Sequence, residues 1–149
     1  MIGIGKGSDT YLSMNERTGW RDQELSERHR RYGPDVPAQD VDLLLVEYDA
    51  CKPRALIEYK HQSAREQYIS NPQFQVLINL ANAADLPAFC VRYAANFEWW
   101  KVVPLNDKAK EIIPNRIVLN EQRYVRFLYH LRGRTAPQSV LDNLDAPAV

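Results

Sequence analysis

The residues from 41 to 61, VDLLLVEYDACKPRALIEYKH, constrain the fold more than any other part of this chain. Two apolar runs flank the turn-forming sequence DACKP, and this pattern is typical of a β-hairpin with a longer loop. Charged residues interrupt these runs, among them Asp42, Glu58 and Lys60. Charged side chains seldom enter such strands without a partner or a function. We therefore expect a functional site on this hairpin.

The spacing of these charges predicts a metal site. Side chains alternate between the two faces of a strand, so Glu58 and Lys60 point to the same face. If the hairpin folds symmetrically about Cys51, Asp42 and Glu58 are diagonal neighbours, about 7–8 Å apart at the backbone. Two such carboxylates can hold one Mg²⁺ ion, which also keeps water and binds substrate phosphate. A bound ion can polarise a phosphodiester and activate a water molecule, so the pattern favours a phosphodiesterase.

At these residues the chain resembles the PD-(D/E)xK nuclease superfamily. Asp42 matches its first acidic position, and Glu58-Tyr59-Lys60 matches its E-x-K motif. The resemblance implies that Asp42, Glu58 and Lys60 are catalytic. It also implies a Mg²⁺ ion, with Mn²⁺ as the alternative, bound by Asp42, Glu58 and the backbone carbonyl of Tyr59. Asp40 lies two residues before Asp42, on the same face of the strand, and is the alternative first metal ligand.

A helix is expected at residues 20–32, ended by Gly33. In the resembled superfamily a helix before the first acidic strand often adds a glutamate to the metal site. Glu24 or Glu27 would match it, and both are equally well explained as solvated charges. Two arginine clusters are candidates for binding a phosphate backbone, with exposed helix faces as the simpler explanation. They are Arg28, Arg30 and Arg31 on this helix, and Arg132 and Arg134 after the last helix.

The rest of the chain predicts further helices and strands. A polar, helical stretch is expected at 62–70, and Asn71-Pro72 is typical of a helix start. Strands are expected at 88–94 and 97–103, with the first parallel to the preceding motif strand. Residues 104–118 are expected to be irregular apart from the start of one short strand at 116–119, and Asn120 is expected to cap a last helix. Trp99 and Trp100 could stack on unpaired bases, but burial is favoured.

This order, α-β-β-α-β-β-α, indicates an α/β fold with a central mixed β-sheet flanked by helices. The resemblance implies a restriction-endonuclease-like αβββαβ core. With 149 residues, the chain is expected to form one nuclease-like domain at 20–134, between a flexible arm at 1–19 and a loosely ordered tail at 135–149. The formal net charge is zero, so nucleic-acid binding requires local basic patches.

The two cysteines lack metal-ligand spacing, and no apolar run is long enough for a signal peptide or a membrane span. A cytoplasmic protein without a membrane partner is therefore expected. The leading interpretation is a magnesium-dependent DNA endonuclease that acts on branched DNA, as junction resolvases do, and forms a symmetric homodimer. The alternative is a non-catalytic nucleic-acid-binding or regulatory module on the same fold. The sequence leaves open endonuclease or exonuclease action, and DNA or RNA as substrate.

Overall fold

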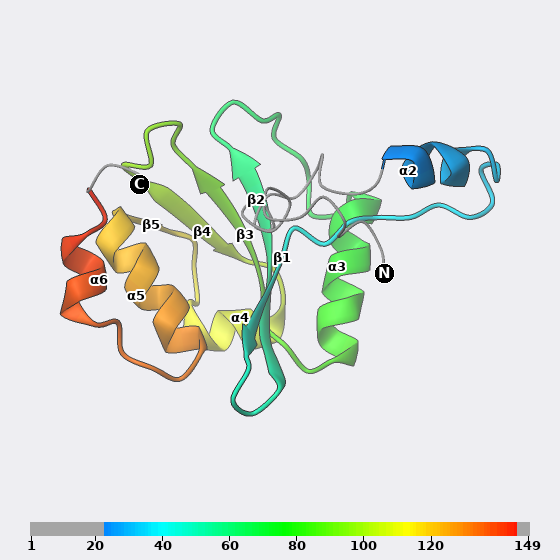
Figure 1. The fold of residues 1–149 in the computed structure, drawn as a ribbon. Coiled ribbons are helices and arrows are strands. Elements are labelled where there is room, and N and C mark those ends of the chain that lie inside the picture. Colours follow the sequence, from blue (N-terminus) through cyan, green and yellow to red (C-terminus); the bar gives the residue numbers. More distant parts are fainter. Residues whose placement is uncertain (1–22, 146–149) are drawn as a thin grey trace. The chain divides into compact units, whose positions relative to one another are not determined.

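The structure is a computed structural model that describes residues 23–145. The flexible arm expected at residues 1–19 lies outside the described residues. The chain forms two compact units, Met1–Leu43 and Leu44–Val149. The elements are α2 (Gln23–Arg30), β1 (Leu43–Glu47), β2 (Lys52–His61), α3 (Pro72–Ala83), β3 (Ala88–Tyr93), β4 (Trp100–Pro104), α4 (Asp107–Ile112), β5 (Ile117–Leu119), α5 (Glu121–Leu131) and α6 (Gln138–Asp142) (Figure 1).

In the first unit, helix α2 falls within the region predicted to be helical. Its last turn tightens, because the amides of Arg31 and Tyr32 bond to carbonyls three residues back. Gly33 follows with φ of +89°, a conformation that favours glycine and ends the helix as predicted. The unit boundary at Leu43 falls inside the single domain predicted for 20–134. The connection at 31–42 contains turns but no helix or strand.

The sheet is mixed, as predicted, and its five strands lie in the order β1-β2-β3-β4-β5. Strand β2 pairs with β3 in parallel, and β3–β4 and β4–β5 are antiparallel. A tight turn joins β1 to β2, with a Cys51 amide bond to the Tyr48 carbonyl and a φ of +54° at Cys51. In the described residues two strands, not three, separate α2 from α3, which differs from the αβββαβ order.

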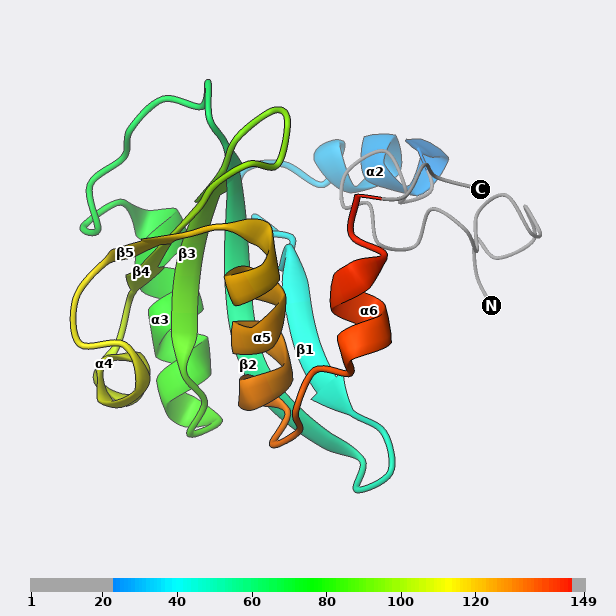
Figure 2. The same ribbon diagram turned by 90° about the vertical axis from the view of Figure 1, so that its left-hand side faces the viewer.

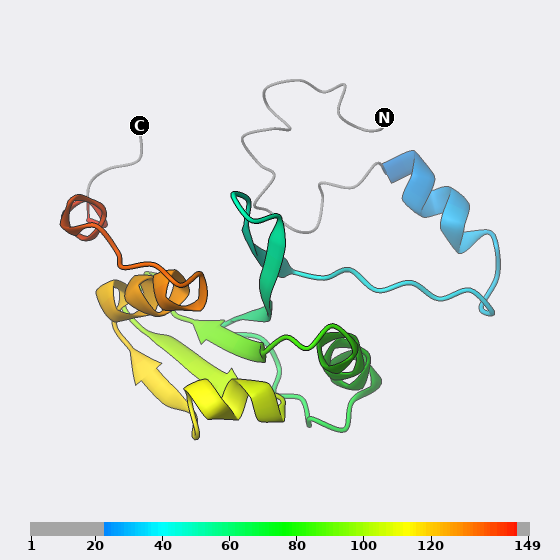
Figure 3. The ribbon, with the colours of Figure 1, turned by 90° about the horizontal axis from the view of Figure 1, so that it is seen from below.

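Helices cover both faces of the sheet (Figures 2 and 3). On one face, Leu56 of β2 packs with Phe74 and Leu77 of α3 in a buried cluster. On the other face, Phe89 of β3 meets Phe127 of α5 edge to face, with ring centroids 5.1 Å apart. Strand β2 is therefore buried on both sides, and its alternating side chains project either toward α3 or toward α5. No helix in the part of the chain that the structure describes is long and apolar enough to cross a bilayer.

Some predicted elements differ from the structure. Residues 62–70 are not helical, because Arg92 Nη1 donates to the carbonyls of His61 and Ala64 and holds that backbone in a loop. The region expected to be irregular contains α4, whose first turn is capped by the Asn106 side chain. The tail contains α6, which buries Leu141. The strand expected from residue 97 begins at Trp100, after a positive φ of 61° at Phe97.

Candidate metal and phosphate site

Glu58 and Lys60 lie two residues apart on β2 and form an ion pair. Lys60 Nζ is 3.1 Å from Glu58 Oε2, and the two side chains are only 17–18% exposed. Lys60 Nζ also lies 5.8 Å from the ring centre of Phe74 on α3. Both charged groups therefore project to the α3 face, at the end of a strand whose preceding residues, Ala55 to Ile57, are fully buried. The shared face predicted from side-chain alternation is confirmed.

Asp42 is half-buried and stands immediately before β1, as the first unit ends. Asp40 is exposed in the connection that leads to it. The hairpin that was predicted to join the first acidic position to the E-x-K sequence is confirmed as β1 and β2. The shared ion between Asp42 and Glu58, and the choice between Asp42 and Asp40, stay predictions.

The donor set on β2 suits a hard cation. In residues 23–145 there is no group of three or more histidine, cysteine, aspartate or glutamate side chains that could hold a metal ion. Mg²⁺ does not require one, since it is usually bound by one or two carboxylates together with water and substrate phosphate. Glu58 with one acidic partner and the Tyr59 carbonyl would be sufficient. Lys60 cannot be a ligand, because an ammonium group only donates hydrogen bonds.

The side chain of Tyr59 points away from this site. Its hydroxyl lies 2.5 Å from the hydroxyl of Tyr124 on α5, on the opposite face of the sheet. Trp100 stacks on Tyr124 at 4.4 Å between ring centroids. Burial among these rings raises the pKa of Tyr124 well above its usual range. Trp100 packs against helix α5, but both Trp99 and Trp100 are half-buried, so the burial favoured for the two tryptophans is only partly realised. Only the backbone of Tyr59 remains a candidate for the metal site.

A cationic pocket of about 220 Å³ adjoins Lys60 on the α3 face. Five of its lining residues are basic and one is acidic, in a chain whose formal net charge is zero. The basic residues are Lys60, Arg65, Arg92, Lys101 and Arg116. Four of these five were not identified from the sequence, because they are scattered from residue 65 to residue 116 and are brought together only by strand pairing and two loops.

The predicted ligand and arginine cluster on α2 belong to the first unit. Helix α2 has no buried residue, and Glu24 and Glu27 are exposed along it. Arg28, Arg30 and Arg31 are likewise exposed, the last just beyond the helix. Their roles in metal and nucleic-acid binding stay predictions.

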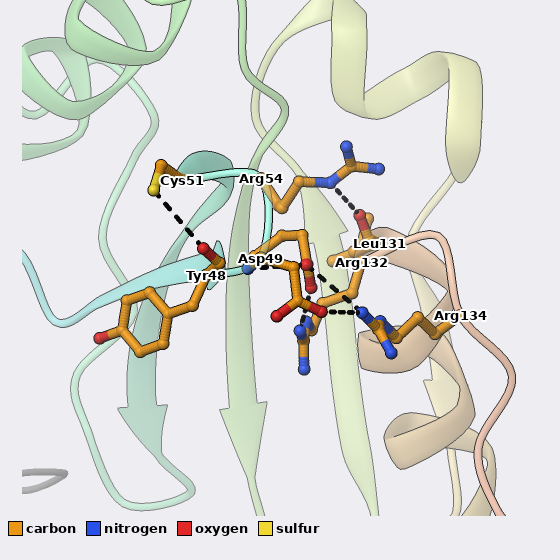
Figure 4. Close-up of polar contacts among 8 residues, drawn as sticks. Tyr48, Asp49, Cys51, Arg54, Leu131, Arg132 and Arg134 are labelled. Atoms are coloured by element: carbon orange, nitrogen blue, oxygen red, sulfur yellow. Dashed lines mark hydrogen bonds and ion pairs between the residues drawn. The ribbon is translucent and has the colours of Figure 1, made fainter.

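Arg132 and Arg134 converge on the hairpin turn, next to Asp49 (Figure 4). Arg132 is hydrogen bonded to Glu47, while Arg134 Nη2 lies 3.4 Å from Glu47 Oε2 and 2.7 Å from Asp49 Oδ2. Arg54 Nε adds a hydrogen bond of 2.9 Å to the Leu131 carbonyl at the end of α5. These contacts tie the end of α5 to the hairpin. They give both arginines a structural partner, and their predicted role in nucleic-acid binding is untested.

The pKa of Glu47 is held below its usual value, first by its hydrogen bond from Arg132 and then by the charge of Arg134, against the opposing effect of burial. A carboxyl with a lowered pKa in the folded state stabilises the fold above its unfolded-state pKa. That stabilisation is lost as the pH falls through the folded-state pKa. The pKa of Arg134 shifts upward, because the nearby carboxylates of Glu47 and Asp49 favour its charged form.

Glu47→Gln is therefore expected to lower the thermal unfolding temperature at pH 7 by a few degrees, because Arg132 loses its charged partner in a half-buried position. The difference from the parent protein should shrink as the pH falls below the ordinary range of a glutamate and through the lowered pKa of Glu47, where the parent carboxyl itself becomes protonated. Thermal denaturation followed by circular dichroism from pH 3 to 7 measures both effects. The same substitution at the exposed Glu111 is the control, and a pH-independent loss in Glu47→Gln would contradict the assignment.

Comparisons with models of known protein families, with curated proteins and with solved structures find no match for this chain.

Proposed function

We propose that this protein is a metal-dependent DNA endonuclease that hydrolyses phosphodiester bonds. The observation that supports this proposal best is the placement of Glu58 and Lys60 on one face of a rigid, buried strand, beside a cationic pocket. Acidic metal ligands, a fixed ammonium group and a basic surface are the three parts that hydrolysis of a polyanion requires. Branched DNA cut by a symmetric dimer is the substrate class that the resemblance favours.

The residues of the chain have distinct roles in this proposal. Glu58, with Asp42 and the Tyr59 carbonyl, would hold Mg²⁺. When bound, the ion would supply Lewis acidity and lower the pKa of a coordinated water molecule. Lys60 orients the attacking water and offsets the negative charge that develops on the phosphate. The packing of Lys60 beside Phe74 and its ion pair with Glu58 hold the ammonium group in position before substrate arrives.

The ion pair itself favours one alternative function. A carboxylate neutralised by a lysine 3.1 Å away is also what a structural charge pair looks like. A chain that kept the fold and the basic pocket, but whose Glu58 pairs with Lys60 and binds no metal ion, would be a non-catalytic nucleic-acid-binding or regulatory module. Metal affinity separates the two functions.

Isothermal titration of the parent protein with Mg²⁺ or Mn²⁺ tests the proposal. We expect one binding site in the parent and a loss of affinity of about tenfold or more in Glu58→Gln, because the amide keeps the shape but lacks the charge that a divalent cation requires. Glu111→Gln is the matched control, since its exposed side chain lies on α4 and is not among the residues that line the pocket. Equal metal affinity in Glu58→Gln and the parent would favour the alternative.

A further inference from the structure

The cationic pocket contains a row of like charges that runs across three strands. Lys60 of β2 is directly opposite Arg92 of β3, and Arg92 is directly opposite Lys101 of β4. All three line the same pocket, so their side chains share the α3 face. Like charges placed opposite one another on a sheet are destabilising. Two acidic side chains offset part of this repulsion, since Glu58 pairs with Lys60 and Glu66 lies 3.7 Å from Arg92, and a bound anionic ligand would offset the rest.

Arg92 holds the pocket together. Its side chain is only 14% exposed, and Nη1 donates to the carbonyls of His61 at 3.0 Å and Ala64 at 2.7 Å. These bonds hold the loop after β2 and bring Arg65 to the pocket wall. Because Nη1 donates to these carbonyls and Nη2 lies 3.7 Å from the carboxylate of Glu66, Arg92 is a positioning residue.

Three other basic residues are available to contact a ligand. Arg65 and Arg116 are exposed, and Lys101 is half-buried. Neighbouring strands are about 4.8 Å apart, so Lys101 lies about 10 Å from Lys60 at the backbone. The apolar side chains of Phe74, Val103 and Leu105 line the same pocket and lower the local polarity, which strengthens charge interactions. The pocket therefore suits an anion that extends beyond the phosphate that would react at Glu58 and Lys60.

We infer that the pocket binds phosphate groups of the nucleic-acid backbone adjacent to the phosphate that is cut, with Arg65, Lys101 and Arg116 as the phosphate-binding residues. The identity of the ligand rests on the proposed function, because Glu58 and Lys60 would take the phosphate that reacts. The basic row defines a path for the bound nucleic acid, from Glu58 on β2 across β3 to β4. Phosphate contacts of this kind fix the register of a nucleic acid without reading its sequence.

Fluorescence anisotropy of a labelled single-stranded DNA oligonucleotide tests the inference. The full chain is titrated at several salt concentrations in EDTA, which removes any bound metal ion. A double variant, Lys101→Gln with Arg116→Gln, should reduce the slope of log affinity against log salt by about 1.4, since each phosphate contact on a single strand contributes about 0.7. Lys110→Gln with Arg123→Gln is the matched control, because it removes one exposed lysine and one exposed arginine elsewhere. Its slope should stay close to that of the parent.

Three results would overturn the inference: no oligonucleotide binding by the parent, equal slopes in the parent and the pocket variant, or the same loss in the control. Inorganic phosphate is added in a further arm at matched ionic strength. If inorganic phosphate bound the pocket more tightly than the oligonucleotide does, the pocket would be assigned to free anions instead of a backbone. If the salt slope fell only in the pocket variant and calorimetry showed no metal binding, the pocket would be confirmed as a phosphate-binding site. The nuclease proposal would then be refuted.

Discussion

Lys60→Ala is expected to lower the rate of Mg²⁺-dependent DNA cleavage by about 10²–10³-fold while metal affinity is retained, because one preorganised electrostatic partner of the transition state is lost. Lys60 is not a metal ligand, so its removal separates catalysis from ion binding in a way that removal of Glu58 cannot. Single-turnover cleavage at saturating protein measures the chemical step without the contribution of binding.

Lys52→Ala provides the matched control, since Lys52 begins the same strand and is exposed at its far end. Its cleavage rate should equal that of the parent. Lys60→Met tests whether lost packing alone explains the effect of Lys60→Ala, because it keeps the apolar stem beside Phe74 and removes only the charge. If Lys60→Met cleaved at the parent rate, the role assigned to the ammonium group would be wrong.

Asn106→Ala is expected to lower the free energy of unfolding by about 3–5 kcal/mol. Asn106 is 5% exposed, and its side-chain oxygen accepts hydrogen bonds from the amides of Ala88 and Ala109. Its side-chain nitrogen donates to the Leu86 carbonyl at 2.8 Å and to Asn82 at 3.0 Å. Loss of the helix cap costs about 1 kcal/mol, and each buried polar group left without a partner adds about 1–3 kcal/mol.

Asn120→Ala separates the two contributions to this cost. Asn120 caps α5 in the same way, accepting a hydrogen bond from the Arg123 amide, but it is exposed. Water can replace the lost bond there, so the cost should be only about 1 kcal/mol. Urea unfolding, extrapolated linearly to water, measures both variants. Similar costs at the two positions would show that Asn106 is only a cap and not the junction between α3, β3 and α4.

Local sequence patterns correctly predicted the structural features that depend on interactions between residues close in sequence. Asn71 and Asn120 cap their helices as their side-chain chemistry predicts, each accepting a hydrogen bond from an amide of the first turn. The hairpin around Cys51 and the parallel pairing of β2 with β3 also follow from chain order and turn chemistry. The loop at 62–70 could not be predicted, because its conformation depends on a distant side chain, Arg92.

The candidate site was also predictable from the sequence only where it depends on residues close together in the chain. The shared face of Glu58 and Lys60 follows from alternation along one strand. The basic row could not be found in this way, because it depends on which residues of β3 and β4 lie opposite Lys60. Arg132 and Arg134 resemble a basic patch in the sequence, yet their partners, Glu47 and Asp49, lie more than 80 positions away.

Cleavage of end-labelled DNA tests the central claim most directly. A four-way junction, a flap and a linear duplex are incubated with the parent chain, Glu58→Gln or Glu111→Gln, in Mg²⁺ or in EDTA. We predict that the parent and Glu111→Gln cut at least one substrate in Mg²⁺ and none in EDTA, and that Glu58→Gln cuts none. Cleavage by Glu58→Gln at the parent rate, or no cleavage by a parent protein that binds both metal and DNA, would contradict the proposal that this protein is a nuclease.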